Sequence, residues 1–162
     1  MAEEKTNVMR ALDQKKIPYT PHSYPHSEGE AVDGATVAAM LGRDPADVFK
    51  TLVTRGASKA NYVFVVPVLA ELDLKKAAKA VGEKSIELIH VKELTPLTGY
   101  VRGGCSPIGM KKRLKTFIDA SAQDHTAILV SAGKIGYQVE LSPDALAGLI
   151  GGRFADVVKA DG

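Results

Sequence analysis

Lys50 is the residue whose surroundings most clearly suggest chemistry, because it lies inside the apolar segment V-F-K-T-L-V-T at residues 48–54. A lysine in such a segment must reach solvent, pair with a carboxylate or line a cleft. On an edge strand its side chain could extend along the surface to water and have no functional role. In a pocket, its ammonium group could hold a phosphate or a developing oxyanion.

The second candidate is the glycine-rich segment G-Y-V-R-G-G-C-S-P-I-G-M-K-K at residues 99–112. Gly103 and Gly104 allow positive φ angles and a close approach of the backbone to a ligand. Ser106 and Pro107 predict the start of a helix, with serine as the N-cap and proline at the first helical position. Such a loop would leave backbone N–H groups free to bind a negative oxygen. The alternative is a tight connection followed by a solvated basic helix.

Cysteine and histidine give weaker signals. Cys105 lies next to the predicted helix start, where a thiolate would be stabilised, so a thiol-dependent enzyme is one alternative. No histidine accompanies it in a recognisable local motif. His22 and His26 are four residues apart, but the neighbouring prolines prevent a helix that would align them on a metal. Walker, dinucleotide-binding, G-x-S-x-G and H-E-x-x-H patterns are absent, so we expect no cofactor and no metal.

Composition indicates an ordinary globular protein, with 162 residues of which 45% are hydrophobic and 25% charged. The sequence has no apolar run of membrane-spanning length and begins with a polar, acidic segment, so we expect a cytoplasmic protein and no membrane partner. The single cysteine excludes an internal disulfide. The net charge of +2 is small, but basic residues cluster at 75–84 and 102–115. Such clusters can hold a phosphate backbone or simply form a solvated face.

Local patterns predict a single α/β domain over residues 1–162. Helices are expected near residues 6–16, 35–41, 73–81 and 142–150. Strands are expected near residues 19–24, 48–54, 62–68, 85–91, 115–119, 127–131 and 135–141. Residues 94–97 are predicted to form a short turn. The sheet should be mixed, because the last strands are joined too closely for parallel crossovers.

Several segments together resemble the YbaK family of free-standing aminoacyl-tRNA deacylases, which are related to the editing domain of bacterial prolyl-tRNA synthetases. They cover nearly the whole chain in the family's order. The segments are H-S-Y ending at Tyr24, V-F-K-T-L around Lys50, L-D-L-K-K-A-A-K-A from Leu72, T-G-Y-V-R-G-G-C-S-P-I-G-M-K-K-R-L from Thr98, F-I-D-A from Phe117 and S-A-G-K-I-G-Y-Q-V-E-L from Ser131. The resemblance implies an α+β-like domain with a mixed sheet or partly closed barrel flanked by helices.

The resemblance also implies a substrate and a mechanism. Members of this family remove cysteine wrongly attached to the proline tRNA, so the expected partners are a misacylated tRNA and prolyl-tRNA synthetase. The substrate's own sulfhydryl attacks the ester carbonyl and leaves as a cyclic thioester, while the protein supplies positioning and charge stabilisation. The family's essential lysine corresponds to Lys50 and its pocket tyrosine to Tyr24. Its loop, whose backbone would approach the ester or the terminal adenosine, corresponds to Gly103, Gly104, Ser106 and Pro107.

Two positions depart from the pattern of cysteine-removing members. An aromatic residue expected in the loop after Tyr24 is Asp33 here, and an aspartate expected before the V-E-L segment is Gln138. Both are expected to line the amino-acid pocket, so alanine, serine and threonine stay alternatives to cysteine. A non-catalytic module that binds tRNA or a synthetase is a further alternative.

Overall fold

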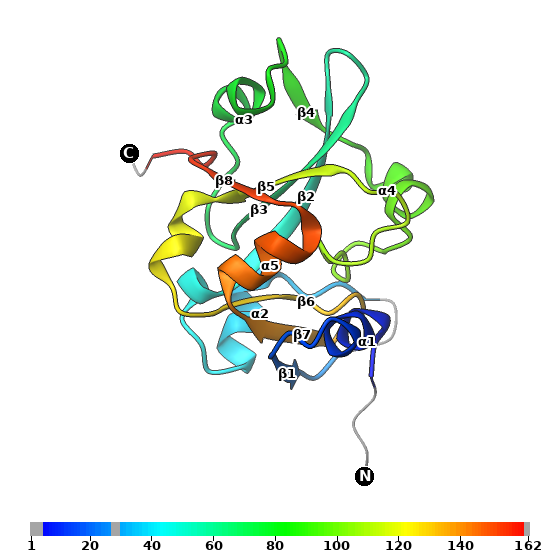
Figure 1. Cartoon of the computed structure of the whole chain (residues 1–162), viewed down its shortest axis with the longest axis vertical. Helices are drawn as coiled ribbons and strands as arrows, with labels where there is room; N and C mark the ends of the chain where they lie inside the picture. The colour runs from blue at the N-terminus through cyan, green and yellow to red at the C-terminus, as the bar shows by residue number, and fades with distance from the viewer. Residues whose placement is uncertain (1–4, 27–29, 161–162) are drawn as a thin grey trace.

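Strands of the chain form two separate sheets in the computed structural model, which describes residues 5–26 and 30–160 (Figure 1). The smaller sheet is antiparallel, in the order β1 (Thr20–Ser23), β7 (Tyr137–Leu141) and β6 (Ile128–Ser131). The larger sheet has the order β4 (Ile86–Leu88), β2 (Phe49–Gly56), β3 (Asn61–Pro67), β5 (Lys115–Asp119) and β8 (Arg153–Ala155). It is mixed, because β3 pairs antiparallel with β2 and parallel with β5.

The predicted α/β architecture with a mixed sheet is confirmed, but the sheets do not close into a barrel. Strands β4 and β8 end the larger sheet, and they do not pair with each other within the described residues. An isolated parallel bridge between Val48 and Leu129 joins the two sheets at one corner. The corner brings the start of β2 close to β6, which places Lys50 beside the smaller sheet.

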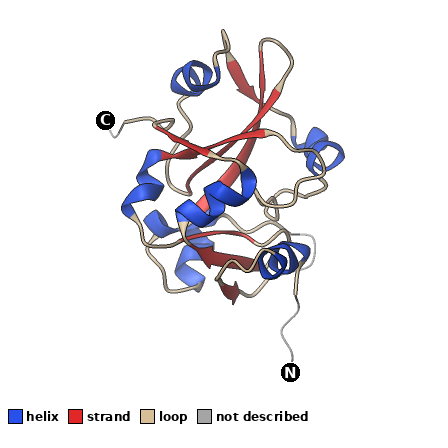
Figure 2. Cartoon of the chain, in the orientation of Figure 1, coloured by secondary structure: helices blue, strands red, loops and turns tan. Residues whose placement is uncertain are grey.

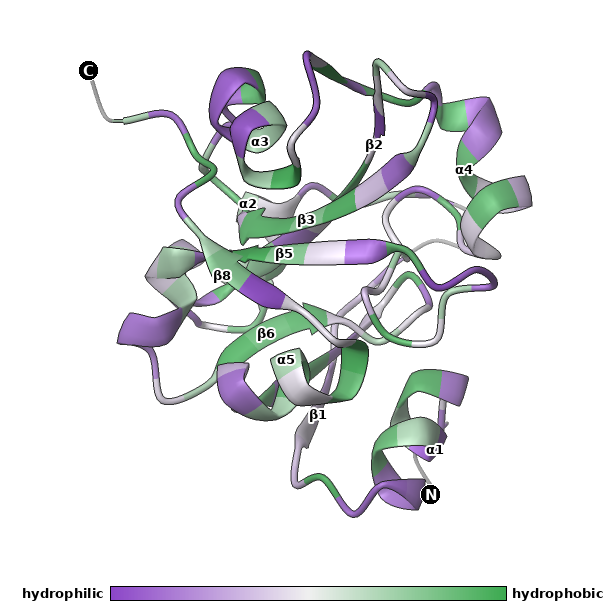
Figure 3. Cartoon of the chain, turned by 45° about the horizontal axis from the view of Figure 1, so that its top comes forward, coloured by the Kyte–Doolittle hydropathy of each residue, from purple (hydrophilic) through white to green (hydrophobic). Residues whose placement is uncertain are grey.

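Burial explains which strand is central. Residues 62–66 of β3 are all buried, as their apolar run predicts for a strand covered on both faces. Figure 3 shows β3, β5 and β6 as mainly hydrophobic ribbons in the middle of the molecule. Strand β1 contains Pro21 and lies at an edge, where a missing backbone donor does no harm.

The helices begin and end largely at the predicted signals. They are α1 (Asn7–Gln14), α2 (Gly34–Met40), α3 (Leu74–Val81), α4 (Val91–Thr98) and α5 (Pro143–Ile150). Short 3₁₀ helices cover Pro45–Asp47 and Ala120–Asp124. The side chains of Thr6, Asp73 and Ser142 cap α1, α3 and α5 by accepting backbone N–H bonds. Helices α1 and α5 contribute Val8, Leu12 and Leu146 to the core that lies between the sheets.

Three sequence predictions about local structure were wrong or incomplete. Residues 94–97 belong to the longer helix α4, which contains Pro96 and ends at Gly99. Strand β8 was not predicted, because its three residues carry little pattern of their own and pair only with the distant β5. No helix begins at Ser106, and residues 101–114 form an irregular loop (Figure 2).

The reason for the missing helix lies in the contacts of this loop. The Ser106 hydroxyl accepts a hydrogen bond from the Ile108 N–H at 3.2 Å, which closes a turn rather than a helix. Gly109 then has a φ of +73°, which interrupts any helical run. The Tyr100 hydroxyl donates to the Ile108 carbonyl, and Ile108 itself is buried. Tertiary packing therefore overrides the capping signal of Ser106 and Pro107.

Candidate active site

A cavity of about 120 Å³ at the corner between the sheets brings together four of the residues predicted from the sequence. Lys50 comes from β2, Gln138 from β7, Tyr24 from the end of β1, and Gly103 from the irregular loop. These positions are far apart in the sequence and meet only because the two sheets touch at the Val48–Leu129 bridge. The lysine and the glycine loop thus face one cavity.

Lys50 is a half-buried cation without an ion pair among the described residues. Burial lowers the pKa of its ammonium group from the usual 10.5, and the Glu71 carboxylate acts weakly in the opposite direction. An ammonium group that has lost part of its hydration without gaining a partner favours binding of a negatively charged group. The structure therefore favours a pocket role for Lys50 over a side chain extended to bulk water.

Two side-chain oxygens on this cavity are buried without a hydrogen-bond partner in the described structure. They are Oγ1 of Thr51 and Oε1 of Gln138. A buried polar atom left unpaired costs about 1–3 kcal/mol, so proteins rarely keep one without a reason. Two such atoms on one cavity make it a candidate ligand site. The hydroxyl can donate a hydrogen bond to the ligand, and the amide oxygen can accept one.

Thr51 was not among the predicted site residues. Its signal in the sequence was weak, because neighbouring residues of a strand normally point to opposite faces. If Lys50 faces the cavity, this alternation predicts that Thr51 faces away from it. The cavity reaches both residues at the corner of the sheets. Only the unpaired Thr51 hydroxyl, which is a property of the folded chain, identifies this position.

Tyr24 lines one side of the cavity, and its position is fixed by burial and by a backbone hydrogen bond. Its side chain is buried, and its backbone N–H donates to the Gly136 carbonyl at 2.9 Å. His26 lies against it, with Nδ1 3.0 Å from the Tyr24 carbonyl oxygen. Burial raises the pKa of the Tyr24 hydroxyl, against the effect of a hydrogen bond from the Gly136 backbone. The hydroxyl therefore stays neutral and can position a substrate without adding charge.

The residues predicted around the glycine loop divide into two groups. Gly103 lines the cavity at a φ of +86°, and a Cβ there would come within 2.8 Å of the Ala31 Cβ. Gly104, Ser106 and Pro107 are buried but are not among the residues that line the cavity. A Cβ on Gly104 would lie 3.0 Å from the Ile135 nitrogen, so this glycine permits close packing of the loop on the β6–β7 hairpin. These three residues are therefore buried members of the loop that do not line the cavity.

Asp33 lies outside the cavity, although its neighbours Val32 and Gly34 line it. It is exposed and is the N-cap of α2, where its carboxylate accepts hydrogen bonds from the N–H and the hydroxyl of Thr36. The capping contact explains an aspartate at this position without any substrate.

Cys105 also lines the cavity but does not have the properties of a nucleophile. Its side chain is 9% exposed, and burial raises the pKa of the thiol to about 12. A hydrogen bond with the Thr98 side chain acts in the opposite direction and does not overcome this effect. Because the thiolate is the reactive form, the structure disfavours the thiol-dependent alternative.

Two further structural features bear on other functions. No group of three or more His, Cys, Asp or Glu side chains there is arranged to hold a metal ion. None of the helices in residues 5–26 and 30–160 combines the length and apolar character needed to cross a membrane.

Comparison with known proteins decides the family. A model of the aminoacyl-tRNA editing domain matches residues 28–149. The chain belongs to this family. The editing domain is also 48% identical over 159 residues to an Enterococcus faecalis protein named "Putative Cys-tRNA(Pro)/Cys-tRNA(Cys) deacylase EbsC", with 98% of this chain and 96% of that protein covered. The family expected from the sequence segments is confirmed, and with it the assignment to aminoacyl-tRNA editing.

Solved structures share the fold of this editing domain. One is titled "a putative trans-editing enzyme for prolyl tRNA synthetase", with a TM-score of 0.80, 23% identity and coverage of 97% of this chain and all of that one. Another, of the hypothetical protein APE2540, has a TM-score of 0.85 and 21% identity, and the match covers 95% of this chain and all of that one. At these identities the likeness establishes the two-sheet architecture.

Proposed function

We propose that this editing domain is a trans-acting deacylase that releases a wrongly attached amino acid from tRNA, with Cys-tRNA(Pro) as its first-choice substrate. The observation that carries the proposal is the cavity of Lys50. An unpaired cation, a free donor on Thr51 and a free acceptor on Gln138 face one space of about 120 Å³. The name of the 48% identical relative supports cysteine as the amino acid.

The proposed reaction needs no nucleophile from the protein. The substrate's sulfur forms a bond to its own ester carbonyl carbon, and the bond from that carbon to the ribose oxygen breaks. The sulfhydryl proton ends on the ribose hydroxyl, and the amino acid leaves as a cyclic thioester. Lys50 stabilises the negative charge that develops on oxygen as the sulfur attacks. The raised thiol pKa of Cys105 agrees with a mechanism that does not use a protein thiolate.

The remaining residues hold the substrate in a reactive geometry. Gln138 Oε1 can accept a hydrogen bond from the substrate's amino group, and the Thr51 hydroxyl can donate one to an ester oxygen. Tyr24 and the Gly103 backbone limit the space around them. If the pocket fixes the substrate's sulfur and carbonyl carbon at attack distance, the substrate loses its bond rotations before the reaction, and the activation barrier of ring closure falls.

The small volume of the cavity favours a small amino acid, and alanine, serine and threonine are alternatives to cysteine. Gln138 is uncharged where the cysteine-removing pattern has an aspartate, so the preference cannot be transferred from that pattern. A synthetase pocket built for proline discriminates poorly against amino acids of similar or smaller size, which is the reason for separate editing. A synthetase partner, prolyl-tRNA synthetase, is part of this proposal.

The decisive experiment mixes the purified protein with tRNAs charged with cysteine, alanine, serine or threonine and measures the amino acid released. We expect the cysteine substrate to be deacylated fastest, and Lys50→Ala to slow release by at least about 100-fold, as for loss of a group that stabilises an oxyanion. Lys79→Ala, on the exposed face of α3, is the matched control and should be unaffected. Release from none of the tRNAs would instead support a non-catalytic binding module.

A modified substrate tests the mechanism separately from the activity. A tRNA carrying 2-aminobutyrate nearly keeps the shape of the side chain, because a methyl group replaces the sulfhydryl, but it lacks the attacking sulfur. We expect its deacylation to be at least about 100-fold slower than that of cysteine, while it still competes for binding. Equal rates for the two substrates would show that water attacks the ester directly.

A further inference from the structure

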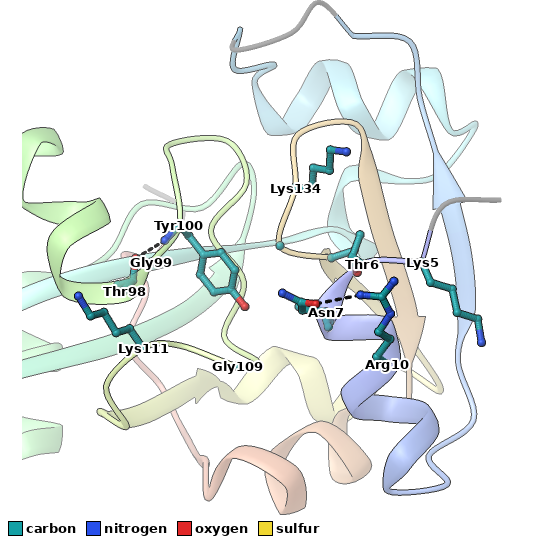
Figure 4. Close-up of a pocket in the computed structure, with 13 residues that line it drawn as sticks. Lys5, Thr6, Asn7, Arg10, Thr98, Gly99, Tyr100, Gly109, Lys111 and Lys134 are labelled. Carbon is teal, nitrogen blue, oxygen red and sulfur yellow. Dashed lines mark hydrogen bonds between the residues drawn. The ribbon is translucent and has the colours of Figure 1, made fainter.

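A second cavity, larger than that of Lys50, is lined in part by the β6–β7 turn and is basic. Its volume of about 750 Å³ is within the range of about 300–1,000 Å³ found for ligand pockets. It forms where the start of α1, the end of α4 with its following loop, and the β6–β7 turn meet (Figure 4). These three parts supply the basic residues Lys5, Arg10, Lys111 and Lys134.

Two of these cations keep an uncompensated charge within the described residues. Arg10 bonds the neutral amide oxygen of Asn7 at 3.2 Å, and Lys111 has no ion pair there. Lys5 differs, because its ammonium group pairs with Asp13 and points away from the cavity (Figure 4). None of the described lining residues is an aspartate or a glutamate. An open cavity lined by uncompensated positive charges, with no carboxylate among its described lining residues, attracts anions.

Tyr100 forms a wall of the basic cavity without adding charge. Its hydroxyl donates to the Ile108 carbonyl at 2.5 Å, and burial raises its pKa to about 12, so it stays neutral. A Cβ on Gly133 would lie 3.0 Å from Tyr100 Cε1, which shows how tightly the hairpin turn packs on the ring. The wall is therefore fixed by packing.

The basic cavity and the Lys50 cavity share a wall. Ser131 lines the Lys50 cavity, and the next two residues, Ala132 and Gly133, line the basic one. In the glycine-rich segment 99–112, Gly103 lines the first cavity and Gly99 the second. A space of about 120 Å³ can enclose an aminoacyl group but no nucleotide, so the RNA attached to that group must continue across the adjoining surface.

We infer that the basic cavity binds the sugar-phosphate backbone of the tRNA acceptor end, with Arg10 and Lys111 as its phosphate contacts. A guanidinium group can bind a phosphate through two parallel hydrogen bonds, and a lysine contributes a point charge. The two residues stand on opposite sides of the cavity, on α1 and on the irregular loop (Figure 4). The inference rests on the proposed function, because that function supplies the RNA.

The test measures binding of uncharged tRNA at several salt concentrations. The variant R10Q/K111Q removes both contacts, and K75Q/K79Q removes two exposed charges from α3 as a control with the same net charge. We expect R10Q/K111Q to bind roughly tenfold more weakly at physiological salt. Its plot of log affinity against log salt should be shallower by about 1.4–1.8, which corresponds to two phosphate contacts. The control should retain the wild-type slope.

Further measurements separate this inference from the proposed function. With a hydrolysable aminoacyl-tRNA, R10Q/K111Q should raise KM about tenfold and change kcat less than twofold. If R10Q/K111Q matches the control in slope and KM while the wild type deacylates, the cavity inference is overturned and the deacylase stands. If the wild type binds tRNA through these residues but releases no amino acid, the deacylase fails and the cavity inference stands.

Unfolding temperatures and single variants show whether a loss of binding reflects misfolding. Unfolding temperatures of both double variants should lie within about 2 °C of the wild type, because the four side chains are exposed. If the double variant does not fold, the single variants R10Q and K111Q should each reduce the slope by about 0.7–0.9. A loss of binding to prolyl-tRNA synthetase with unchanged RNA binding would overturn the inference in favour of an acidic protein surface.

Discussion

Thr51 Oγ1 and Gln138 Oε1 line the same cavity from two different sheets, and neither has a hydrogen-bond partner among the described residues. One can donate a hydrogen bond to a ligand and the other can accept one. An unpaired buried polar atom costs free energy, and a substrate group that paired with it would recover that cost. We therefore expect substitutions of Thr51 to change both stability and activity.

Replacing Thr51 with valine should stabilise the protein and impair it. Valine has a similar shape but no hydroxyl, so we expect the free energy of unfolding to rise by about 1 kcal/mol, or the unfolding temperature by about 2–4 °C. Loss of one neutral hydrogen bond to the substrate should reduce kcat/KM by about 3–10-fold. Thermal unfolding and deacylation kinetics measure the two effects.

Thr54 on the same strand provides a matched control for Thr51. It is buried like the Thr51 oxygen, but its hydroxyl already donates to the Tyr62 carbonyl at 3.0 Å. Thr54→Val should therefore destabilise the protein by about 1 kcal/mol and leave kcat/KM unchanged once folding is complete. If both variants lose stability equally, the Thr51 hydroxyl has a partner in the free protein and its role as a ligand contact is wrong.

The rate of deacylation should fall at alkaline pH because Lys50 must carry its proton. Burial lowers the pKa of this ammonium group below its usual 10.5, so the charged form is lost earlier than for an exposed lysine as pH rises. As pH rises above the pKa of Lys50, kcat/KM should therefore decrease. Below that pKa, Lys50 should cause no change in kcat/KM with pH. A pH profile, corrected for uncatalysed ester hydrolysis, measures the decrease.

Lys50→Arg provides the comparison for the pH profile. A guanidinium group keeps its charge throughout the accessible range, so the variant should be slower but should lose the alkaline decrease. Substrate ionisation is common to both proteins and cancels in their ratio. An identical alkaline decrease in Lys50→Arg would assign the decrease to another group.

Cys105 should be dispensable for catalysis. Its pKa of about 12 leaves almost no thiolate at neutral pH, so Cys105→Ala should retain kcat/KM within about threefold. Alkylation by iodoacetamide at pH 8 should be at least about 100-fold slower in the native protein than in the unfolded chain. Rapid alkylation with parallel loss of activity would restore the thiol-enzyme alternative.

Substitutions of Asp33 separate helix capping from amino-acid selection. Asn caps a helix about as well as Asp, so Asp33→Asn should keep the unfolding temperature, whereas Asp33→Ala should cost about 1 kcal/mol. Because Asp33 is exposed and lies outside the cavity, we expect both variants to keep the wild-type order of preference among cysteine, alanine, serine and threonine. A changed order in Asp33→Asn would support the substrate contact predicted from the sequence.

The sequence predicted much of the local structure because its signals are short-range. The predicted helix ranges 6–16, 73–81 and 142–150 agree with α1, α3 and α5 to within two residues at each end. Strand β3 was predicted as central from its apolar run alone. The same kind of reasoning failed at Ser106, where packing of the buried Ile108 outweighed a good capping pair.

The sequence by itself determined the family and the presence of a glycine-rich segment, and it identified Lys50 as a candidate, because these depend on residue types and their order. Only the tertiary structure decided which residues share a cavity. It joined Lys50 to Gln138, Tyr24 and Gly103 and added Thr51, since contacts across two sheets depend on how the sheets meet at one corner. The fold likewise placed Arg10 and Lys111 around one opening, although they are about a hundred residues apart in the sequence.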